Sequence, residues 1–397
     1  MMELAAALRD STTRELGKSD IMVEPAELDT VSGLPLHGNI PLQYVLGVDV
    51  LPFGRTLSFV GKEGTLKSML GWYIATIFMR SPGLVNFIDT EHKTNMDQVR
   101  GLTKNDTLLE SLLFRATVMD INQMNAAMGK YGAEYDKLCP ARNVPILYFI
   151  DSIGALTSGK AVAAMEKTGD ASTAAGYEAA RRASDLTEQF RAFVPRFLMG
   201  RPAILIFINH IKVKMEEAGG SNFSPGPPEK GSPGGVHKDY MNTATLELTK
   251  VKGKTDEAVK AAYATIFIKS LKAALAPTGR KIMVTLISEG PVNRRYPDGD
   301  TLGDLESEDD VQRLYADFDW DTALVELLTR EGKTTYSKDR KKSVITIQGT
   351  PNKRKCPELG ITDVVTDAEL GAAIHGNPEM VKALQDVLGI YRKPKPQ

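Results

Sequence analysis

Residues 61–68 have the types and spacing of a loop that binds phosphate groups. They follow the apolar segment 56–60 and precede an apolar, helix-forming segment that begins at Met69. In such a loop the backbone N–H groups surround the phosphates, and the helix N-terminus adds the positive end of its dipole. We predict that Lys67 reaches the β- and γ-phosphates of a nucleotide and that the Ser68 hydroxyl binds Mg²⁺. The predicted nucleotide-binding residues of the loop are Gly61, Lys62, Glu63, Gly64, Thr65, Leu66, Lys67 and Ser68.

Leu66 departs from the common form of this loop, G-x-x-x-x-G-K-[ST], which has glycine before the lysine. A leucine fits here only if the backbone φ is negative, so we expect a negative φ at Leu66. The alternative is a glycine-rich turn in which Lys-Ser occurs by chance. Suitable partner residues further along the chain favour the phosphate loop.

Three other apolar segments end in polar residues that suit nucleotide chemistry. Glu91 follows segment 84–89, where a carboxylate can polarise a water molecule for attack on a γ-phosphorus. Asp151 ends segment 146–151 and is expected to hold Mg²⁺ through water. His210 follows segment 203–209 and is expected to sense the γ-phosphate. We expect these side chains to meet, because ligands bind at the C-terminal edge of parallel strands.

Short apolar segments alternate with longer helix-like stretches from residue 56 onward. The first four segments are apolar on both faces, which is typical of parallel strands covered by helices on both sides. The alternation predicts an α/β core with a central parallel sheet. The predicted strands are 56–60, 84–89, 146–151, 203–209, 245–249, 265–269 and 282–288.

The composition of the 397 residues excludes several classes of protein. Hydrophobic residues make up 42% and charged residues 25%, which argues against a disordered chain or a collagen-like repeat. Cys139 and Cys356, the two cysteines, are far apart, which favours a reducing compartment. No signal peptide is evident, and the longest apolar stretch, 69–79, is shorter than the roughly 20 residues that span a bilayer. We expect a cytoplasmic protein without a membrane partner.

Charge is distributed unevenly toward the C-terminus. Residues 298–321 contain ten acidic residues and one basic residue, whereas residues 331–356 contain eight basic and two acidic ones. The net charge of −1 averages these two segments, so it does not exclude a nucleic-acid partner. We predict three regions: an N-terminal oligomerisation arm (1–34), a core (35–290) and a C-terminal domain (291–397) with an acidic connector. Residues 1–18 form either a surface helix or an arm that packs on another subunit.

These segments together resemble RecA-type recombinases over about residues 35–290. The resemblance rests on LPFGRTLSFVGKEG, FIDTEH, FIDSIGALT, LIFINHIKVK and the Pro-Gly-Gly of 233–235. The bulky Leu66 and the sensor His210 are more similar to the phage branch, UvsX. The resemblance implies an α/β fold: a RecA-like P-loop ATPase core with a central parallel sheet, an N-terminal helical arm and a small C-terminal α+β domain.

The resemblance also implies roles for individual residues. Glu91 matches the catalytic glutamate that activates water, and His210 matches the γ-phosphate sensor. Two loops, about 159–170 and 211–235, match the segments that contact single-stranded DNA, and the second is expected to lack regular structure. The implied DNA-contacting residues are Met165, Lys167, Lys212, Lys214, Met215 and Phe223.

Three further positions match residues that the family uses between subunits. Lys269 and Lys272 match two cations that reach a neighbour's γ-phosphate and act as catalytic residues, although their spacing is one residue wider than in bacterial RecA. Tyr240 matches an interface aromatic residue. Asn95 and Gln98 stand where bacterial relatives contact and stack on adenine, so recognition of the base is open.

The function that the resemblance implies is ATP- and Mg²⁺-dependent homologous recombination. Such a protein forms helical filaments on single-stranded DNA, pairs it with homologous duplex DNA, and works with loader or single-strand-binding proteins. A DNA helicase or ring ATPase of the same fold is an alternative, as is a filament protein that holds ATP as a static clamp. The basic residues between 338 and 355 suit either duplex DNA or a solvated hairpin.

Overall fold

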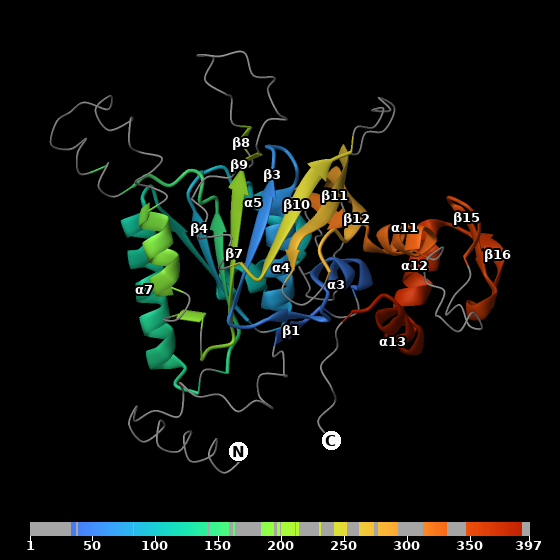
Figure 1. Ribbon diagram of the computed structural model, residues 1–397, viewed down its shortest axis with the longest axis horizontal. Helices are drawn as coiled ribbons and strands as arrows, with labels where there is room; N and C mark the ends of the chain where they lie inside the picture. Colours follow the sequence, from blue (N-terminus) through green and yellow to red (C-terminus); the bar gives the residue numbers. More distant parts are fainter. Residues whose placement is uncertain are drawn as a thin grey trace, which may run out of the picture.

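A nine-stranded mixed sheet, with the strand order β13-β12-β11-β10-β3-β7-β6-β4-β5, organises the protein (Figure 1). The computed structural model describes residues 33–36, 39–81, 83–141, 143–158, 162, 184–193, 197–198, 200–210, 212–213, 230–231, 242–251, 262–273, 277–292, 313–331 and 347–390. The strands of the large sheet are β3 (Arg55–Gly61), β4 (Leu84–Asp89), β5 (Leu113–Thr117), β6 (Ile146–Asp151), β7 (Ala203–His210), β10 (Ala244–Lys250), β11 (Ala262–Ala273), β12 (Lys281–Val292) and β13 (Arg313–Phe318).

The centre of the sheet is parallel, as the sequence predicts. β10, β3, β7, β6, β4 and β5 pair in parallel, whereas β11, β12 and β13 add antiparallel pairs at one edge. The register places Asp89 beside Asp151 and Gly61 beside His210. The ends of four neighbouring strands therefore lie at one edge of the sheet. β5 and β13 were not predicted.

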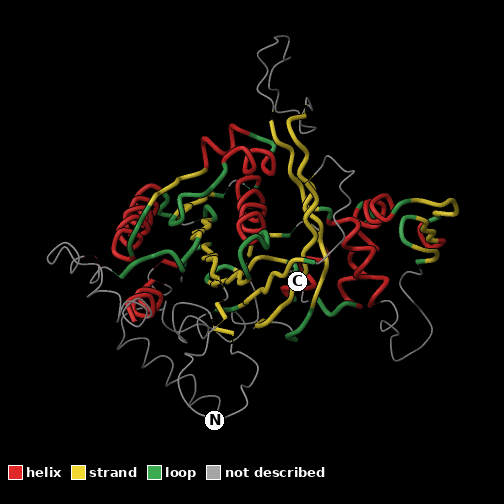
Figure 2. Tube along the Cα trace, turned by 90° about the horizontal axis from the view of Figure 1, so that it is seen from above, coloured by secondary structure: helices red, strands yellow, loops and turns green. Residues whose placement is uncertain are grey.

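Helices cover both faces of the sheet (Figures 1 and 2). The sheet separates two apolar clusters, one on each face. On one face α4 (Lys67–Arg80) packs Trp72 against Phe87 and Phe149. On the other face α7 (Ile121–Leu138) contributes Met124 and Met128 to the second cluster, and residues 184–193 form a further helix. The remaining helices of the core are α3 (Ile40–Leu46), α5 (Met96–Thr103) and α6 (Asp106–Leu112), and β1 (Gly33–Pro35) pairs with β2 (Val50–Pro52).

Close packing fixes α4 on the sheet. A Cβ atom at Gly71 would lie 2.3 Å from Cζ of Phe149, so only glycine lets the helix approach β6 this closely. The first residues of α4, Lys67 and Ser68, are thereby held against the edge where the parallel strands end.

The C-terminal elements lie beside the antiparallel edge of the sheet, at the right in Figure 1. The polar side chains of Arg354 and Asp367 are buried there and meet at 2.9 Å. Strand β13 follows residue 290 and yet belongs to the large sheet. The division into three regions remains a prediction. The elements are α11 (Trp320–Glu331), β14 (Gln348–Thr350), β15 (Lys353–Cys356), η3 (Pro357–Leu359), β16 (Ile361–Val365), α12 (Asp367–His375) and α13 (Pro378–Val387).

The loop 211–235 was expected to lack regular structure, and this expectation is wrong near His210. β8 (Lys212–Val213) pairs antiparallel with β9 (Lys230–Gly231). Backbone N–H and C=O groups at the two ends of the loop thus satisfy each other. Within the described residues, no helix is both long and apolar enough to cross a membrane.

Candidate nucleotide-binding site

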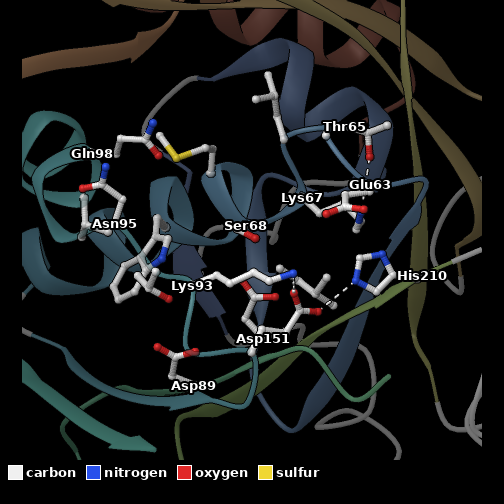
Figure 3. A pocket seen from close by; sticks show the side chains of 18 residues that line it. Glu63, Thr65, Lys67, Ser68, Asp89, Lys93, Asn95, Gln98, Asp151 and His210 are labelled. Carbon is white, nitrogen blue, oxygen red and sulfur yellow. Dashed lines mark hydrogen bonds and ion pairs between the residues drawn. The ribbon is translucent and has the colours of Figure 1, made fainter. Parts of the chain in front are cut away.

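The phosphate loop and the polar strand ends surround one cavity of about 260 Å³ (Figure 3). The loop connects β3 to α4, and the other residues come from the ends of β4, β6 and β7. The cavity therefore brings together most of the predicted nucleotide-binding residues, while Gly61 and Lys62 are in the loop but not in its lining. The predicted residues that line it are Glu63, Gly64, Thr65, Leu66, Lys67, Ser68, Glu91, Asp151 and His210.

Lys67 is buried and folds back onto its own loop. Its Nζ donates to the carbonyl oxygen of Lys62 at 2.6 Å and lies 3.5 Å from Thr65 Oγ1. Thr65 Oγ1 donates to the same carbonyl at 2.8 Å. Burial lowers the pKa of Lys67, although nearby carboxylates, first Asp151 and then Glu91, partly counter that effect. A phosphate group would give this buried ammonium group a full anionic partner.

The expectation of a negative φ at Leu66 is wrong. Leu66 has φ 60° and ψ 24°, the left-handed conformation that glycine usually supplies. The loop thus keeps the glycine-type turn, and the leucine side chain, half-buried, packs against the main apolar cluster. That contact offsets a strain of about 1–2 kcal/mol.

Glu91 is held by groups from two neighbouring strand ends. Ser152 Oγ donates to Oε1 at 2.6 Å, and His210 Nε2 lies 2.9 Å from the same oxygen. Partial burial raises the pKa of Glu91, but the hydrogen bonds from Ser152 and His210, with the charges of His210 and Lys93, outweigh burial and lower it. Glu91 is therefore a carboxylate near neutral pH, and its Oε2 remains the oxygen directed to other partners.

Asp151 and Ser68 form the second polar pair of the cavity. Burial raises the pKa of Asp151 to about 6, while a hydrogen bond from Ser68 acts in the opposite direction. The neighbouring Asp89 has a different environment, because Arg115 contacts its Oδ2 at 2.6 Å. At Asp151, burial thus outweighs the hydrogen bond from Ser68 and the charge of Lys67.

The other end of the cavity has an apolar wall and the carboxamide side chains of Asn95 and Gln98. Leu66, Met69 and Trp72 form part of its wall, and Trp72 Nε1 is buried without a hydrogen-bond partner in the part of the chain that the structure describes. Figure 3 shows Asn95 and Gln98 together at this end, away from Lys67 and His210. Several lining residues were not predicted from the sequence, among them Trp72 and Lys93.

Lys269 and Lys272 lie outside the cavity lining, on β11. Lys269 pairs with Glu247 and Lys272 with Thr245, because the register shifts at a bulge that leaves Leu271 without a pairing partner on β10. Glu247 and Thr245 are two residues apart on one strand and so share a face. The bulge therefore places both lysines on the same face of the sheet.

Several predicted DNA-contacting and interface residues fall outside the described residues. Only the backbone of Lys212 is described, in β8. Most of the arm 1–34, the loop 159–170, residues 298–312 of the acidic connector and residues 338–342 of the basic segment also fall outside. The residues outside are Met165, Lys167, Lys214, Met215, Phe223 and Tyr240.

Substitution of Leu66 tests the balance of strain and contact in the loop. Leu66→Ala removes the apolar contact and keeps the strained φ, whereas Leu66→Gly removes the contact and the strain together. We expect the free energy of unfolding in urea, without nucleotide, to be about 1 kcal/mol higher for Leu66→Gly than for Leu66→Ala. An alanine variant as stable as the glycine variant would show that φ is negative at this position.

Asp151 makes stability depend on pH in the absence of ligand. Its pKa is about 6 in the folded state and about 3.9 when unfolded, so the folded state binds the proton more tightly. Stability therefore falls as pH rises from about 4 to 6, and Asp151→Asn removes a penalty on the order of 2–3 kcal/mol that is present above pH 6. Thermal unfolding without Mg²⁺ should show a more stable Asn variant at pH 8 and little difference at pH 4. Asp89→Asn is the control, and it should destabilise at pH 8 by breaking the Arg115 pair. An Asp151→Asn variant no more stable than the parent at pH 8 would show that burial does not raise the pKa of Asp151.

Comparison with known proteins identifies relatives for this fold and site. The family model described as RecA N-terminal domain matches residues 2–292. Protein RecA of Treponema pallidum is 23% identical over 288 residues, which cover 72% of this chain and 64% of that protein. Protein RecA of Paracoccus denitrificans is 26% identical over 274 residues, 68% of each chain. The chain thus spans slightly less than two thirds of the Treponema pallidum relative. With a family model that covers most of its length, the chain belongs to the RecA family.

Proposed function

We propose that the protein is an ATP-dependent homologous-recombination protein that assembles on single-stranded DNA and exchanges strands with a homologous duplex. The observation that carries the proposal is the meeting of the phosphate loop with Glu91, Asp151 and His210 in one cavity. Membership of the RecA family supports it. The UvsX-like branch remains a prediction that rests on Leu66 and His210, and a cytoplasmic location and loader partners remain predictions as well.

The catalytic step that these groups suit is hydrolysis of the γ-phosphate. Glu91 Oε2 accepts a proton from a water molecule whose oxygen forms a bond to the γ-phosphorus. The bond from the γ-phosphorus to the bridging oxygen breaks, and its electron pair leaves with ADP. The loop N–H groups and Lys67 offset the negative charge on the phosphates. The lowered pKa of Glu91 keeps the base ionised near neutral pH.

Mg²⁺ fits the oxygen donors at the head of α4. Ser68 and Asp151 are hydrogen-bonded to each other, and both line the cavity. Mg²⁺ prefers oxygen ligands and keeps several waters, which suits a hydroxyl and a carboxylate beside a phosphate tail. We assign Ser68 as a direct ligand and Asp151 as a ligand through water. When bound, Mg²⁺ would offset phosphate charge, and its charge would favour the ionised form of Asp151.

The position of His210 supports coupling between nucleotide and DNA. Its ring contacts Glu91, and one residue separates it from β8, which opens the loop 211–235 assigned to DNA. A change at the γ-phosphate can therefore act on the root of the DNA loop over a very short stretch of chain. We retain Lys212, Lys214, Met215 and Phe223, with Met165 and Lys167 of the other loop, as proposed DNA contacts and Tyr240 as a proposed interface residue.

The bulge at Leu271 supports a joint role for Lys269 and Lys272. Lys269 is exposed, and both lysines share one face although they are three residues apart in the sequence. Neither lines the cavity of its own subunit, so a catalytic role for them requires a neighbouring subunit. Two cations from a neighbour would make turnover depend on assembly.

Removal of the Glu91 carboxylate tests the proposed chemistry. ATP turnover of the parent protein should rise on addition of single-stranded DNA, and Glu91→Gln should lower turnover by about 100-fold or more while ATP still binds. Glu134→Gln, on the exposed face of α7, is the control and should match the parent. A parent without DNA-stimulated turnover would contradict the proposal and would favour a static ATP clamp.

Alanine substitution of the two β11 lysines tests the shared-face argument. We expect Lys269→Ala and Lys272→Ala each to lower DNA-stimulated turnover by about 10-fold or more, because each removes a cation from the same cluster. The ATP affinity of dilute protein should not change. The control is Lys250→Ala, an exposed lysine on neighbouring β10. Loss of turnover in the Lys269 variant alone would mean that the bulge does not align Lys272 with the site.

A further inference from the structure

A fixed turn after β4 brings Lys93 back over the Glu91 carboxylate. His92 has φ 56°, and its backbone N–H donates to Asp89 Oδ1 at 2.8 Å. Asp89 is itself held by Arg115 at 2.6 Å, so the turn has a firm base. Lys93 Nζ then lies 3.8 Å from Glu91 Oε2. The side chain of Lys93 is thus directed to the cavity by the local backbone.

The ammonium group of Lys93 has donors left for a ligand. Lys93 Nζ forms an ion pair with Glu91 Oε2 at 3.8 Å, a distance too long for a hydrogen bond. Glu91 Oε1 is already engaged by Ser152 and His210. Lys93 therefore adjoins the oxygen that remains to bind water, and its three N–H groups can turn toward a second anion. Its side chain is 72% exposed, so little packing must break for it to do so.

The net negative charge of the cavity lining favours a second cation near the terminal phosphate. Among the described residues the lining contains four carboxylates and two lysines, so it repels a nucleoside triphosphate unless the cations are well placed. Lys67 acts from the phosphate loop, and Lys93 acts from the turn after β4. Figure 3 shows the Lys93 side chain running across the cavity, where its ammonium group meets the Glu91 carboxylate, with Lys67 on the loop side. The carboxylates are those of Glu63, Asp89, Glu91 and Asp151.

A second cavity shows which end of the site Lys93 faces. This cavity, about 440 Å³, shares Glu63, Glu91, Lys93 and His210 with the first. Asn95 and Gln98, at the opposite end, line only the first cavity. Lys93 therefore lies beside Glu91 where the two cavities meet. We expect the terminal phosphate and the attacking water to bind at this end of the site.

The geometry points to Lys93 as a catalytic residue that donates to a γ-phosphate oxygen while Glu91 accepts the proton of the attacking water. This inference rests on the proposed ATPase function and adds to it a cation supplied by the same subunit. Lys93 offsets the charge that develops on the transferred phosphoryl group. Because it needs no neighbour, Lys93 gives the protein a basal turnover without DNA, to which the lysines of an adjacent subunit add on assembly.

The test compares Lys93→Gln and Lys93→Arg with a matched control, all in the 397-residue chain. Lys137→Gln is the control, because Lys137 is also 72% exposed and lies 3.5 Å from Glu134, on α7 away from the cavity. We expect Lys93→Gln to lower kcat about 10- to 100-fold, both with and without single-stranded DNA. Lys93→Arg should recover much of the loss, and Lys137→Gln should match the parent.

Nucleotide affinity separates contact with the γ-phosphate from a merely structural role. Lys93→Gln should weaken binding of a non-hydrolysable ATP analogue by about 5- to 10-fold and leave ADP affinity within about two-fold. An unchanged kcat and an unchanged ratio of the two affinities would overturn the assignment of Lys93, as would a kcat above that of the parent. A parent turnover that Glu91→Gln leaves intact would contradict the proposed function instead, and the affinity ratio would still decide the role of Lys93.

Discussion

In-register parallel pairing of β3, β7, β6 and β4 is the constraint on which the site depends. Because the strands run in the same direction and end together, Gly61 meets His210 and Asp89 meets Asp151 across neighbouring strands. Side chains 119 residues apart in the chain then reach hydrogen-bond distance, as Glu91 and His210 do. No local interaction could bring these groups together, since each strand contributes only one or two polar residues beyond its apolar body. The two apolar clusters on either face hold the strands, and so they hold the site.

The same arrangement sets which charges in the cavity are balanced before a ligand arrives. Asp89 has Arg115 and Glu91 has Ser152 and His210, but burial leaves Asp151 with a raised pKa and Lys67 with a lowered one. A bound nucleotide with Mg²⁺ would place an anion beside Lys67 and a cation beside Asp151. Such buried charges of both signs are typical of functional sites in stable folds.

Much of this could be read from the sequence, for physical reasons. Fully apolar segments predicted the parallel strands, and the polar residues at their ends predicted the lining of the cavity, because both follow from short-range patterns. The backbone of Leu66 could not be predicted, since a half-buried side chain stabilises a conformation that leucine alone disfavours. That Lys269 and Lys272 share a face could not be predicted without the pairing of β11 with β10. A bulge changes which residues of a strand point to each face, and no sequence pattern marked this bulge. Lys93 was missed for a similar reason, since its direction depends on the left-handed turn at His92.

The central claim is that subunits assemble on single-stranded DNA so that one subunit completes the nucleotide site of the next. Electron microscopy of the 397-residue protein with single-stranded DNA and a non-hydrolysable ATP analogue tests it most directly. We expect open helical filaments in which the β11 face that carries Lys269 and Lys272 of one subunit meets the nucleotide cavity of the next. Closed rings, or filaments in which this face points away from the neighbouring cavity, would contradict it.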